Sequence, residues 1–276
     1  MDVVEKGQLS PADAFEHWYY KAKFHLLVER LRSTRFREPG RRIADVGCGI
    51  GLFMTFLEKA GYVAPQQMVG IDPAYREPGR ALDGGAAILP AWPPNEEVHV
   101  ALLMDVLEHT PDDAAVLRET ADHVETGGYV FITVPAFSWL YSAHDHFLGH
   151  YRRYSLSTLR RLIEGCSGLE IQELHYYYAA VFPAAVPWRL LRRRKNHECS
   201  DMQRVPGWLN RVLSFVMRFE TVISRGNRLA GLSVVALCRK AQPAPRASAA
   251  SDELMTPATG SSAAFQPVRE TPAALA

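Results

Sequence analysis

The chain has 276 residues, of which 47% are hydrophobic and 22% are charged, and its formal net charge is +1. This length allows one large domain or two small ones with a sizeable core, and the near-neutral charge argues against bulk electrostatic binding of nucleic acid. No segment approaches the roughly 20 consecutive apolar residues of a membrane span, and the first ten residues lack the apolar stretch of a secretory signal. The four cysteines show no C-x-x-C pairing, so we expect free thiols and a cytoplasmic protein.

The first expected element is a helix that follows Ser10 and continues to about Arg32. Ser10 is a favourable N-cap, and Pro11 stands in the first turn, where proline is tolerated. The segment EHWYYKAK, residues 16–23, is unusually aromatic for a surface helix.

A strand, a glycine-rich turn and a helix are predicted within RRIADVGCGIGLFMTFL, residues 41–57. Residues 43–46 form a short apolar run typical of a buried strand, and the helix from 52 to 60 ends at Gly61. Glycines let the backbone turn sharply and let a ligand approach it, while the helix N-terminus offers unpaired N–H groups. This arrangement indicates a nucleotide-binding element; the alternative is an ordinary tight turn.

The spacing of the glycines indicates the class of nucleotide. A dinucleotide site has the pattern G-x-G-x-x-G, whereas here the pattern is G-x-G-x-G followed by Leu52. Asp45 lies two residues before the first glycine, where a carboxylate would repel a pyrophosphate but suits a ligand with an ammonium group. The segment DVGCGIG, residues 45–51, resembles motif I of class I S-adenosylmethionine-dependent methyltransferases. The resemblance implies that the turn holds the methionine part and the ribose of S-adenosylmethionine through Asp45, Gly47, Cys48, Gly49 and Gly51.

The second strand, residues 68–71, ends at Asp72, where a doubly wound sheet places a carboxylate that accepts hydrogen bonds from a ribose. We therefore predict that Asp72 binds the cofactor; the alternative is that Asp-Pro merely starts a turn. A short third strand is expected at 86–89. Relatives usually place an acid there to meet the adenine, and this sequence has AAIL instead.

A strong fourth strand, residues 98–104, is followed by DVLEHTPD. Polar groups at the carboxyl end of a strand lie where an open α/β sheet places its site. The segment DVLEH is similar to that of the branch of the family that resembles quinone-biosynthesis methyltransferases. The resemblance implies that Asp105, Val106 and His109 line the cofactor and acceptor pocket; the alternative for His109 is a histidine that caps a helix. A helix at 113–124 and a fifth strand at 129–134 follow.

The segment AFSWLYSAHDHFLGHYRRY, residues 136–154, follows that strand and is the best candidate for the acceptor-binding region. A neutral histidine can deprotonate a hydroxyl or amine, an adjacent aspartate can fix its tautomer, and arginines can hold an anionic acceptor. The pattern S-A-H-D-x-x-x-G-H-x-R-R-Y is similar to a recurrent signature of one bacterial subgroup of these methyltransferases. The predicted residues are His144, His150 and Asp145 for catalysis, and Tyr141, Arg152, Arg153 and Tyr154 for substrate binding.

Two other interpretations of this segment stay open. Its histidines and arginines could pin the loop to the sheet by hydrogen bonds. A metal site could also form, but the spacing matches none of the strong zinc patterns, so no metal is expected.

A long insertion separates the sixth strand, 169–174, from the last strand, 233–238. It begins with YYYAAVFPAAVPW at 176–188, continues into a basic run, and contains a second amphipathic helix at 209–223. The apolar-then-basic order suits a bilayer interface over anionic headgroups, and it also suits a helical cap over the acceptor pocket. We favour the cap and keep peripheral membrane contact through 176–195 as the alternative.

The resemblance implies a doubly wound α/β sheet of seven strands in the order 3-2-1-4-5-7-6, with the last strand antiparallel. Residues 1–40 are expected to form an N-terminal helical lid, because related methyltransferases often close the site there; plain packing is the alternative. The methyltransferase domain is expected at 41–240, with the helical cap insertion at 176–231. Residues 241–276, rich in Ala, Pro, Ser and Thr, are expected to form a disordered tail.

The expected function is methyl transfer from S-adenosylmethionine to an oxygen or nitrogen nucleophile of a small-molecule acceptor, with no nucleic-acid partner. Two alternatives remain. One is a non-catalytic cofactor-binding or membrane-associated scaffold, and the other is a nicotinamide-dependent oxidoreductase, which Leu52 in the glycine pattern disfavours.

Overall fold

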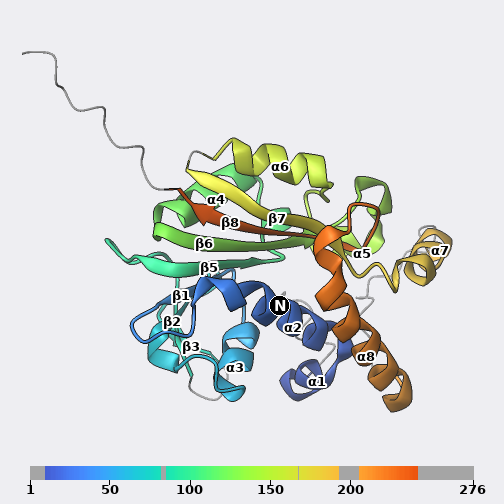
Figure 1. The fold of residues 1–276 in the computed structure, drawn as a ribbon, viewed down its shortest axis with the longest axis horizontal. Coiled ribbons are helices and arrows are strands. Elements are labelled where there is room, and N and C mark those ends of the chain that lie inside the picture. The colour runs from blue at the N-terminus through green and yellow to red at the C-terminus, as the bar shows by residue number, and fades with distance from the viewer. Residues whose placement is uncertain (1–9, 82–84, 167, 193–204, 242–276) are drawn as a thin grey trace, which may run out of the picture. The chain divides into compact units, whose positions relative to one another are not determined.

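The computed structural model describes residues 10–81, 85–166, 168–192 and 205–241. These residues form a sheet of eight strands in the order β3-β4-β2-β1-β5-β6-β8-β7 (Figure 1). The strands are β1 Ile43–Val46, β2 Met68–Ile71, β3 Gly79–Arg80, β4 Ala87–Leu89, β5 Val98–Met104, β6 Val124–Pro135, β7 Leu169–Tyr177 and β8 Ser233–Lys240. The neighbouring pairs β4–β2, β2–β1, β1–β5 and β5–β6 are parallel. The strand β8 runs antiparallel to both β6 and β7.

The doubly wound order expected from the sequence is confirmed, including the antiparallel last strand. The number of strands differs, because β3 adds an eighth strand at the edge. It pairs antiparallel with β4 over two residues, Gly79 with Ile88 and Arg80 with Ala87. A two-residue strand leaves no periodic pattern in the sequence, so this pairing could not be predicted.

Helices cover both faces of the sheet (Figure 1). They are α1 Pro11–Glu16, α2 Trp18–Leu31, α3 Leu52–Lys59, α4 Asp113–Asp122, α5 Ala143–Phe147, α6 Leu156–Glu164, α7 Phe182–Arg192 and α8 Gly207–Ile223. Helices α4 and α6 lie on one face, and α2, α3 and α8 lie on the other. Side chains of β5 alternate between the two cores: Leu102 packs with the α2 and α3 side, and Leu103 with the α4 and α6 side.

The N-terminal helix expected from Ser10 to Arg32 is broken at His17, which has an extended ψ of 130°. Asn210 of α8 bridges the break: its Oδ1 accepts a hydrogen bond from the N–H of Trp18, and its Nδ2 donates to the carbonyl of Glu16, both at 2.8 Å. The prediction of one continuous helix was therefore wrong. The polar groups freed by the break are paired by a residue far along the chain, which local sequence does not reveal.

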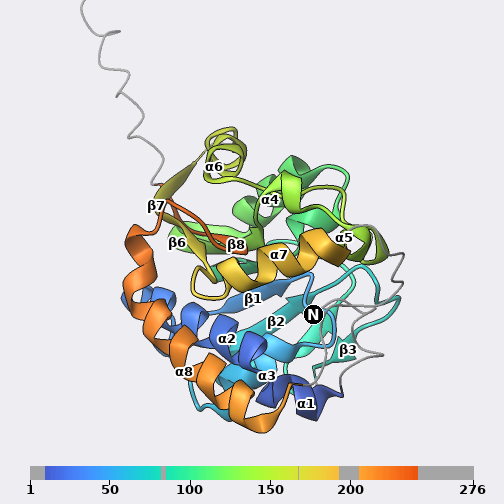
Figure 2. The same ribbon diagram turned by 90° about the vertical axis from the view of Figure 1, so that its right-hand side faces the viewer.

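The insertion between β7 and β8 contains α7 and α8, as expected, and α8 lies along α2 (Figure 2). The Glu220 carboxylate on α8 accepts hydrogen bonds from the N–H groups of Ala179 and Ala180, at 2.7 and 2.9 Å, just before α7. The strand β7 continues to Tyr177, beyond the expected start of the insertion at 176. Tyr177 and Tyr178 are buried, and the Tyr178 hydroxyl donates to the carbonyl of Tyr19 at 2.8 Å.

Within the described ranges, the structure contains no helix that combines the length and the apolar character needed to cross a bilayer. The tail expected over 241–276 lies outside the described residues from 242 onward.

Candidate functional site

The glycine turn between β1 and α3 has a backbone that only glycine adopts easily. Gly47, Gly49 and Gly51 have φ values of 68°, 54° and 75°. A Cβ on Gly47 would lie 2.7 Å from a methyl group of Val106, and one on Gly51 would lie 2.6 Å from the Cβ of Ala81. The turn therefore forms a tight backbone cradle at the N-terminus of α3.

Asp72, at the end of β2, holds this cradle in place. Its Oδ2 accepts a hydrogen bond from the N–H of Gly49 at 2.7 Å, and its Oδ1 accepts one from Ala74 at 2.9 Å. Tyr75 adds a hydrogen bond from its hydroxyl to the carbonyl of Gly49 at 3.1 Å. Each carboxylate oxygen of Asp72 keeps a second lone pair for a ligand hydroxyl.

Asp45 lies beneath the turn with 1% of its surface exposed, and its Oδ2 has no hydrogen-bond partner among the described residues. Burial raises the pKa of Asp45 to about 7, and the nearby Asp72 carboxylate adds to this. Burial likewise raises the pKa of the Cys48 thiol, so this cysteine stays protonated and is no nucleophile. A cationic ligand beside Asp45 would favour its charged form.

At the end of β5, Asp105 connects the sheet to α2. It has a φ of 57°, accepts a hydrogen bond from the Thr133 hydroxyl at 2.9 Å, and forms an ion pair with Lys23 of α2, whose side chain is only 2% exposed. A cavity opens here. It is lined from α2 by Tyr19, Tyr20 and Lys23, from the region after β5 by Asp105, Glu108 and His109, and from later segments by His144, His150, Arg153 and Arg189.

Asp145 is the centre of the 136–154 loop and is fully buried. Its Oδ1 pairs with Nδ1 of His150 at 2.8 Å and accepts from Nε of Arg153 at 2.7 Å, while its Oδ2 accepts from the N–H of Ser142 at 2.9 Å. Burial acts to raise the pKa of Asp145, but the hydrogen bonds and the guanidinium charge outweigh it and hold the pKa below its usual range. Because Asp145 is ionised, Nδ1 of His150 is the donor and Nε2 is left for chemistry.

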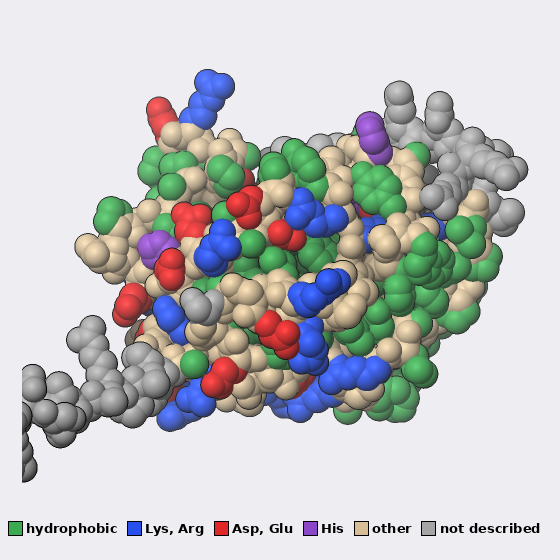
Figure 3. Space-filling model, turned by 90° about the horizontal axis from the view of Figure 1, so that it is seen from above, with side chains coloured by type: hydrophobic (Ala, Val, Ile, Leu, Met, Phe, Trp, Pro, Cys, Tyr) green, Lys and Arg blue, Asp and Glu red, His purple; other side chains and the backbone are tan. Residues whose placement is uncertain are grey.

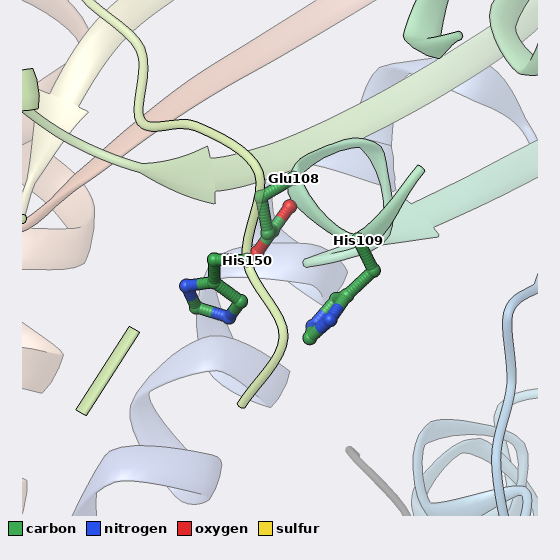
Figure 4. A group of neighbouring side chains, drawn as sticks. All are labelled: Glu108, His109 and His150. Carbon is green, nitrogen blue, oxygen red and sulfur yellow. The ribbon is translucent and has the colours of Figure 1, made fainter. Parts of the chain in front are cut away.

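His150 contacts His109 in the turn after β5, and both residues line the cavity. Its ring lies edge-on to that of His109, with ring centres 4.5 Å apart. Figure 4 shows the side chains of Glu108, His109 and His150 converging. The structure thus brings together predicted site residues from two segments: His144, His150, Arg153, Asp105 and His109 all line one cavity.

Three residues predicted to bind substrate have partners within the protein. The hydroxyl of Tyr141 donates to the carbonyl of His150 at 2.6 Å. Arg152 forms an ion pair with Asp113 at 3.0 Å, and the Tyr154 hydroxyl donates to the same carboxylate at 2.7 Å. These contacts join the loop to itself and to α4, whereas the alternative interpretation has the loop pinned to the sheet. Roles for these residues in substrate binding remain predictions.

Sequence reasoning did not select Lys23, Glu108 or Arg189 as site residues. Glu108 lies within the DVLEH segment, and this segment is the sequence pattern that could have identified it as a site residue. It is 1% exposed, and its Oε2 has no hydrogen-bond partner in the described part of the chain. Burial raises its pKa to about 8. Lys23 lies in the aromatic segment 16–23 and Arg189 in the basic run after 188, but neither pattern identified the individual residue.

A family profile described as "Methyltransferase domain" matches residues 15–174, more than half of the chain. The chain belongs to this methyltransferase family. The matched segment of the methyltransferase includes α2, the glycine turn and the 136–154 loop, and α7 and α8 lie beyond it.

Curated relatives of this methyltransferase are called ubiquinone biosynthesis O-methyltransferase. The protein of Ralstonia nicotianae is 35% identical over 151 residues, which cover 47% of this chain and 61% of the relative. That of Bordetella bronchiseptica is 35% identical over 115 residues, covering 37% of this chain and 46% of the relative. The chain thus matches about half to three fifths of the length of these relatives.

A solved structure of the plantazolicin methyltransferase BpumL in complex with S-adenosylhomocysteine has a similar fold. It superposes with a TM-score of 0.50 at 11% identity, covering 87% of this chain and 95% of that one. At this identity the likeness concerns the fold alone.

Proposed function

We propose that this methyltransferase moves the methyl group of S-adenosylmethionine to an oxygen or nitrogen atom of a small-molecule acceptor. The observation that carries the proposal is the adjacency of the glycine cradle and the polar cavity. Val106 packs against Gly47 of the cradle, and its neighbour Asp105 lines the cavity. A cofactor held by the cradle can therefore reach an acceptor in the cavity.

The cradle fits S-adenosylmethionine on three counts. The positive φ values of its glycines give a tight turn that presents backbone N–H groups at the N-terminus of α3 to a ligand. Asp72 has lone pairs for the ribose hydroxyls. The Oδ2 of Asp45, which no described residue hydrogen-bonds, suits the positive charge of the methionine part. The S-adenosylhomocysteine named for BpumL and the O-methyltransferase name of the relatives support the same cofactor and an oxygen acceptor.

S-adenosylmethionine supplies an activated methyl group on a sulfonium when bound. The chain's own residues then hold the acceptor in line with that methyl and exclude water, which accounts for most of the rate. An acceptor that arrives protonated must lose its proton, and His150 is the group best placed to act on it. Asp145 fixes its tautomer, and His144 lines the same cavity.

A second proposed property is contact with a membrane, from which the acceptor would come. The outward side of α8 carries an apolar stripe of Trp208, Val212, Phe215, Phe219 and Val222, each at least half exposed. Exposed Trp188 and Leu190 of α7 lie within 176–195, the segment for which peripheral membrane contact is the alternative to a cap. In Figure 3 hydrophobic side chains gather on the side where α7 lies in Figure 1, whereas charges of both signs are interspersed over the rest of this view.

We infer that the α8 stripe binds the surface of an anionic bilayer, from which a lipid-like acceptor would enter. Arg211 and Arg218 are exposed beside the stripe, and the acid of this helix, Glu220, is buried against Ala179 and Ala180. Aromatic side chains flanked by arginines are typical of helices that lie in a bilayer interface. Vesicle flotation tests this: wild type should float with vesicles containing phosphatidylglycerol, and Phe215→Ser with Phe219→Ser should not. Wild type that stays in solution contradicts it.

The methyl transfer itself is tested with methyl-labelled S-adenosylmethionine and a fractionated extract of small molecules. We expect label to enter an organic-soluble product with the wild-type chain and not with Gly47→Ala. Label that appears only on protein or nucleic acid would contradict the proposed acceptor class.

A further inference from the structure

Arg189 brings a positive charge from the insertion to the cavity. It belongs to α7, lines the cavity together with Tyr19 and Tyr20 of α2, and lies beyond the segment 15–174 that the family profile matches. We propose that Arg189 selects an acceptor that carries a carboxylate or phosphate group, which the guanidinium binds. The inference rests on the proposed function, because it names the chemical class of the acceptor at the same site.

Arg189 stands on the inward face of α7. The half-buried residues of this helix have the spacing of a single helix face, and they are Phe182, Ala185, Val186 and Arg189. The residues between them are exposed. Three of the four inward side chains are apolar, as expected for a helix that covers a cavity. A cation on such a face is favourable where an anionic group meets it, which indicates a ligand rather than packing.

Two contacts fix the start of α7 and so direct its inward face. The Glu220 carboxylate holds the two N–H groups just before the helix, at 2.7 and 2.9 Å. Phe182, in the first turn, packs on Phe137 at the start of the 136–154 loop, with ring centres 5.6 Å apart. Arg189 follows Phe182 by seven residues, which is two helical turns, and therefore lies on the same side of the helix as this contact.

The two arginines that the sequence predicts for an anionic acceptor form ion pairs within the protein. Arg152 pairs with Asp113 at 3.0 Å, and Arg153 pairs with the buried Asp145 at 2.7 Å. Arg189 belongs to neither of these pairs. A guanidinium has five N–H donors in a planar fork that matches a carboxylate or phosphate, so Arg189 can keep a contact within the chain and still bind an anion with two N–H groups.

The charges around the cavity also favour an anion. The other two basic side chains that line it, Lys23 and Arg153, are each matched by a carboxylate partner. Burial raises the pKa of Glu108 to about 8, so this lining carboxyl group is mostly neutral at pH 7. With Arg189 added, the described side chains around the cavity carry an excess of positive charge. Such a cavity attracts an anionic acceptor and disfavours a cationic one.

The anionic group serves as an anchor, because an anion paired with a guanidinium is a weak nucleophile. The hydroxyl or amine that receives the methyl is a separate group of the acceptor, beside His150. Its oxygen or nitrogen forms the bond to the methyl carbon while the carbon–sulfur bond breaks and its electron pair stays on sulfur. The proton passes to Nε2 of His150. The methylated product therefore keeps the negative charge that Arg189 binds.

The test is calorimetric titration of the full chain, saturated with S-adenosylhomocysteine, with benzoate, phenyl phosphate and the uncharged benzamide. We expect at least one of the two anions to bind about tenfold or more tightly than benzamide, and the better anion distinguishes a carboxylate from a phosphate. Arg189→Gln should remove this preference, and Arg189→Lys should keep part of it. Arg160→Gln, which changes an exposed arginine of α6, should show the preference of the wild type.

Labelled methyl transfer to extract pools sorted by charge separates the two proposals, and titration with S-adenosylmethionine reports that each variant is folded. Label should enter the anionic pool, and the product should still bind an anion exchanger. Wild type that prefers neither anion over benzamide, an unchanged preference in Arg189→Gln, or transfer to the neutral pool alone overturns the role of Arg189 and leaves the proposed function standing. Binding of S-adenosylmethionine without transfer to any small-molecule pool would instead contradict the proposed function.

Discussion

Nδ1 of His150 donates to Oδ1 of Asp145 at 2.8 Å, and this fully buried carboxylate also accepts a hydrogen bond from Arg153. The relationship fixes the tautomer of His150 and directs Nε2 to the cavity side of the ring. A loop that looks irregular in sequence is thus built around one ionised carboxylate. The proposed chemistry depends on this pair, because Asp145 positions His150 to act on the proton of the acceptor.

His150→Ala should lower turnover by about 100-fold or more, because it removes the group that acts on the acceptor. The affinity for S-adenosylmethionine should stay within about twofold, since the cradle is formed by other segments. Labelled methyl transfer and calorimetric titration measure the two effects. His146→Ala is the matched control, and normal turnover in His150→Ala would remove this residue from the mechanism.

Asp45 should make cofactor binding depend on pH. Its pKa is about 7 in the unliganded protein because it is buried, and a cation favours the ionised form. The affinity for S-adenosylmethionine should therefore rise from pH 6 to pH 8. Asp45→Asn should weaken binding and remove most of this dependence. An unchanged pH profile in Asp45→Asn would show that another group titrates.

Asp45 should also make stability depend on pH, but stability should fall as the pH rises, whereas cofactor affinity should increase. A carboxyl group whose pKa is raised on folding stabilises the protein fully at pH values below its unfolded pKa, and this contribution is lost as the pH rises toward 7. At pH 8 Asp45→Asn should therefore melt higher than the wild type without cofactor. Each gain of about 1 kcal/mol would raise the melting temperature by about 2–4 °C. Calorimetric scans at pH 5 and pH 8 measure the difference, and a lower melting temperature at pH 8 would contradict it.

Gly47→Ala should weaken cofactor binding at least tenfold. The new Cβ would lie 2.7 Å from Val106, and the residue has a φ of 68°. Gly61→Ala is a matched control, because Gly61 has the same φ of 68° but has nothing within 4 Å of the added Cβ. It should cost about 1 kcal/mol of stability and leave binding intact. Equal loss of binding in both variants would point to backbone strain rather than to the cradle.

Glu220→Ala should destabilise the chain by about 1–3 kcal/mol, because the N–H groups of Ala179 and Ala180 lose their acceptor. Glu220→Gln keeps one acceptor oxygen and should cost less. Urea denaturation measures both, and Arg218→Ala on the exposed side of α8 should be near neutral. A neutral Glu220→Ala would mean that α8 does not hold the start of α7.

Much of the sheet could be predicted because its central strands are short buried runs. The strands β1, β2 and β5 have the bounds expected from sequence, 43–46, 68–71 and 98–104. The break at His17 could not be predicted, since Asn210, which pairs the broken helix ends, is 192 residues from Trp18. Glu108 was overlooked because its chemistry comes from burial and from an Oε2 atom with no hydrogen-bond partner among the described residues, which are properties of the fold.

The central claim is tested most directly by calorimetric titration of the full chain with S-adenosylmethionine and S-adenosylhomocysteine at pH 8, with NADH as the control. We predict micromolar binding of the first two, no binding of NADH, and a loss of about 30-fold or more in Asp72→Ala, which removes the carboxylate that orders the turn and meets the ribose. Tight NADH binding, or no binding of either adenosyl compound by the folded wild type, would contradict the account.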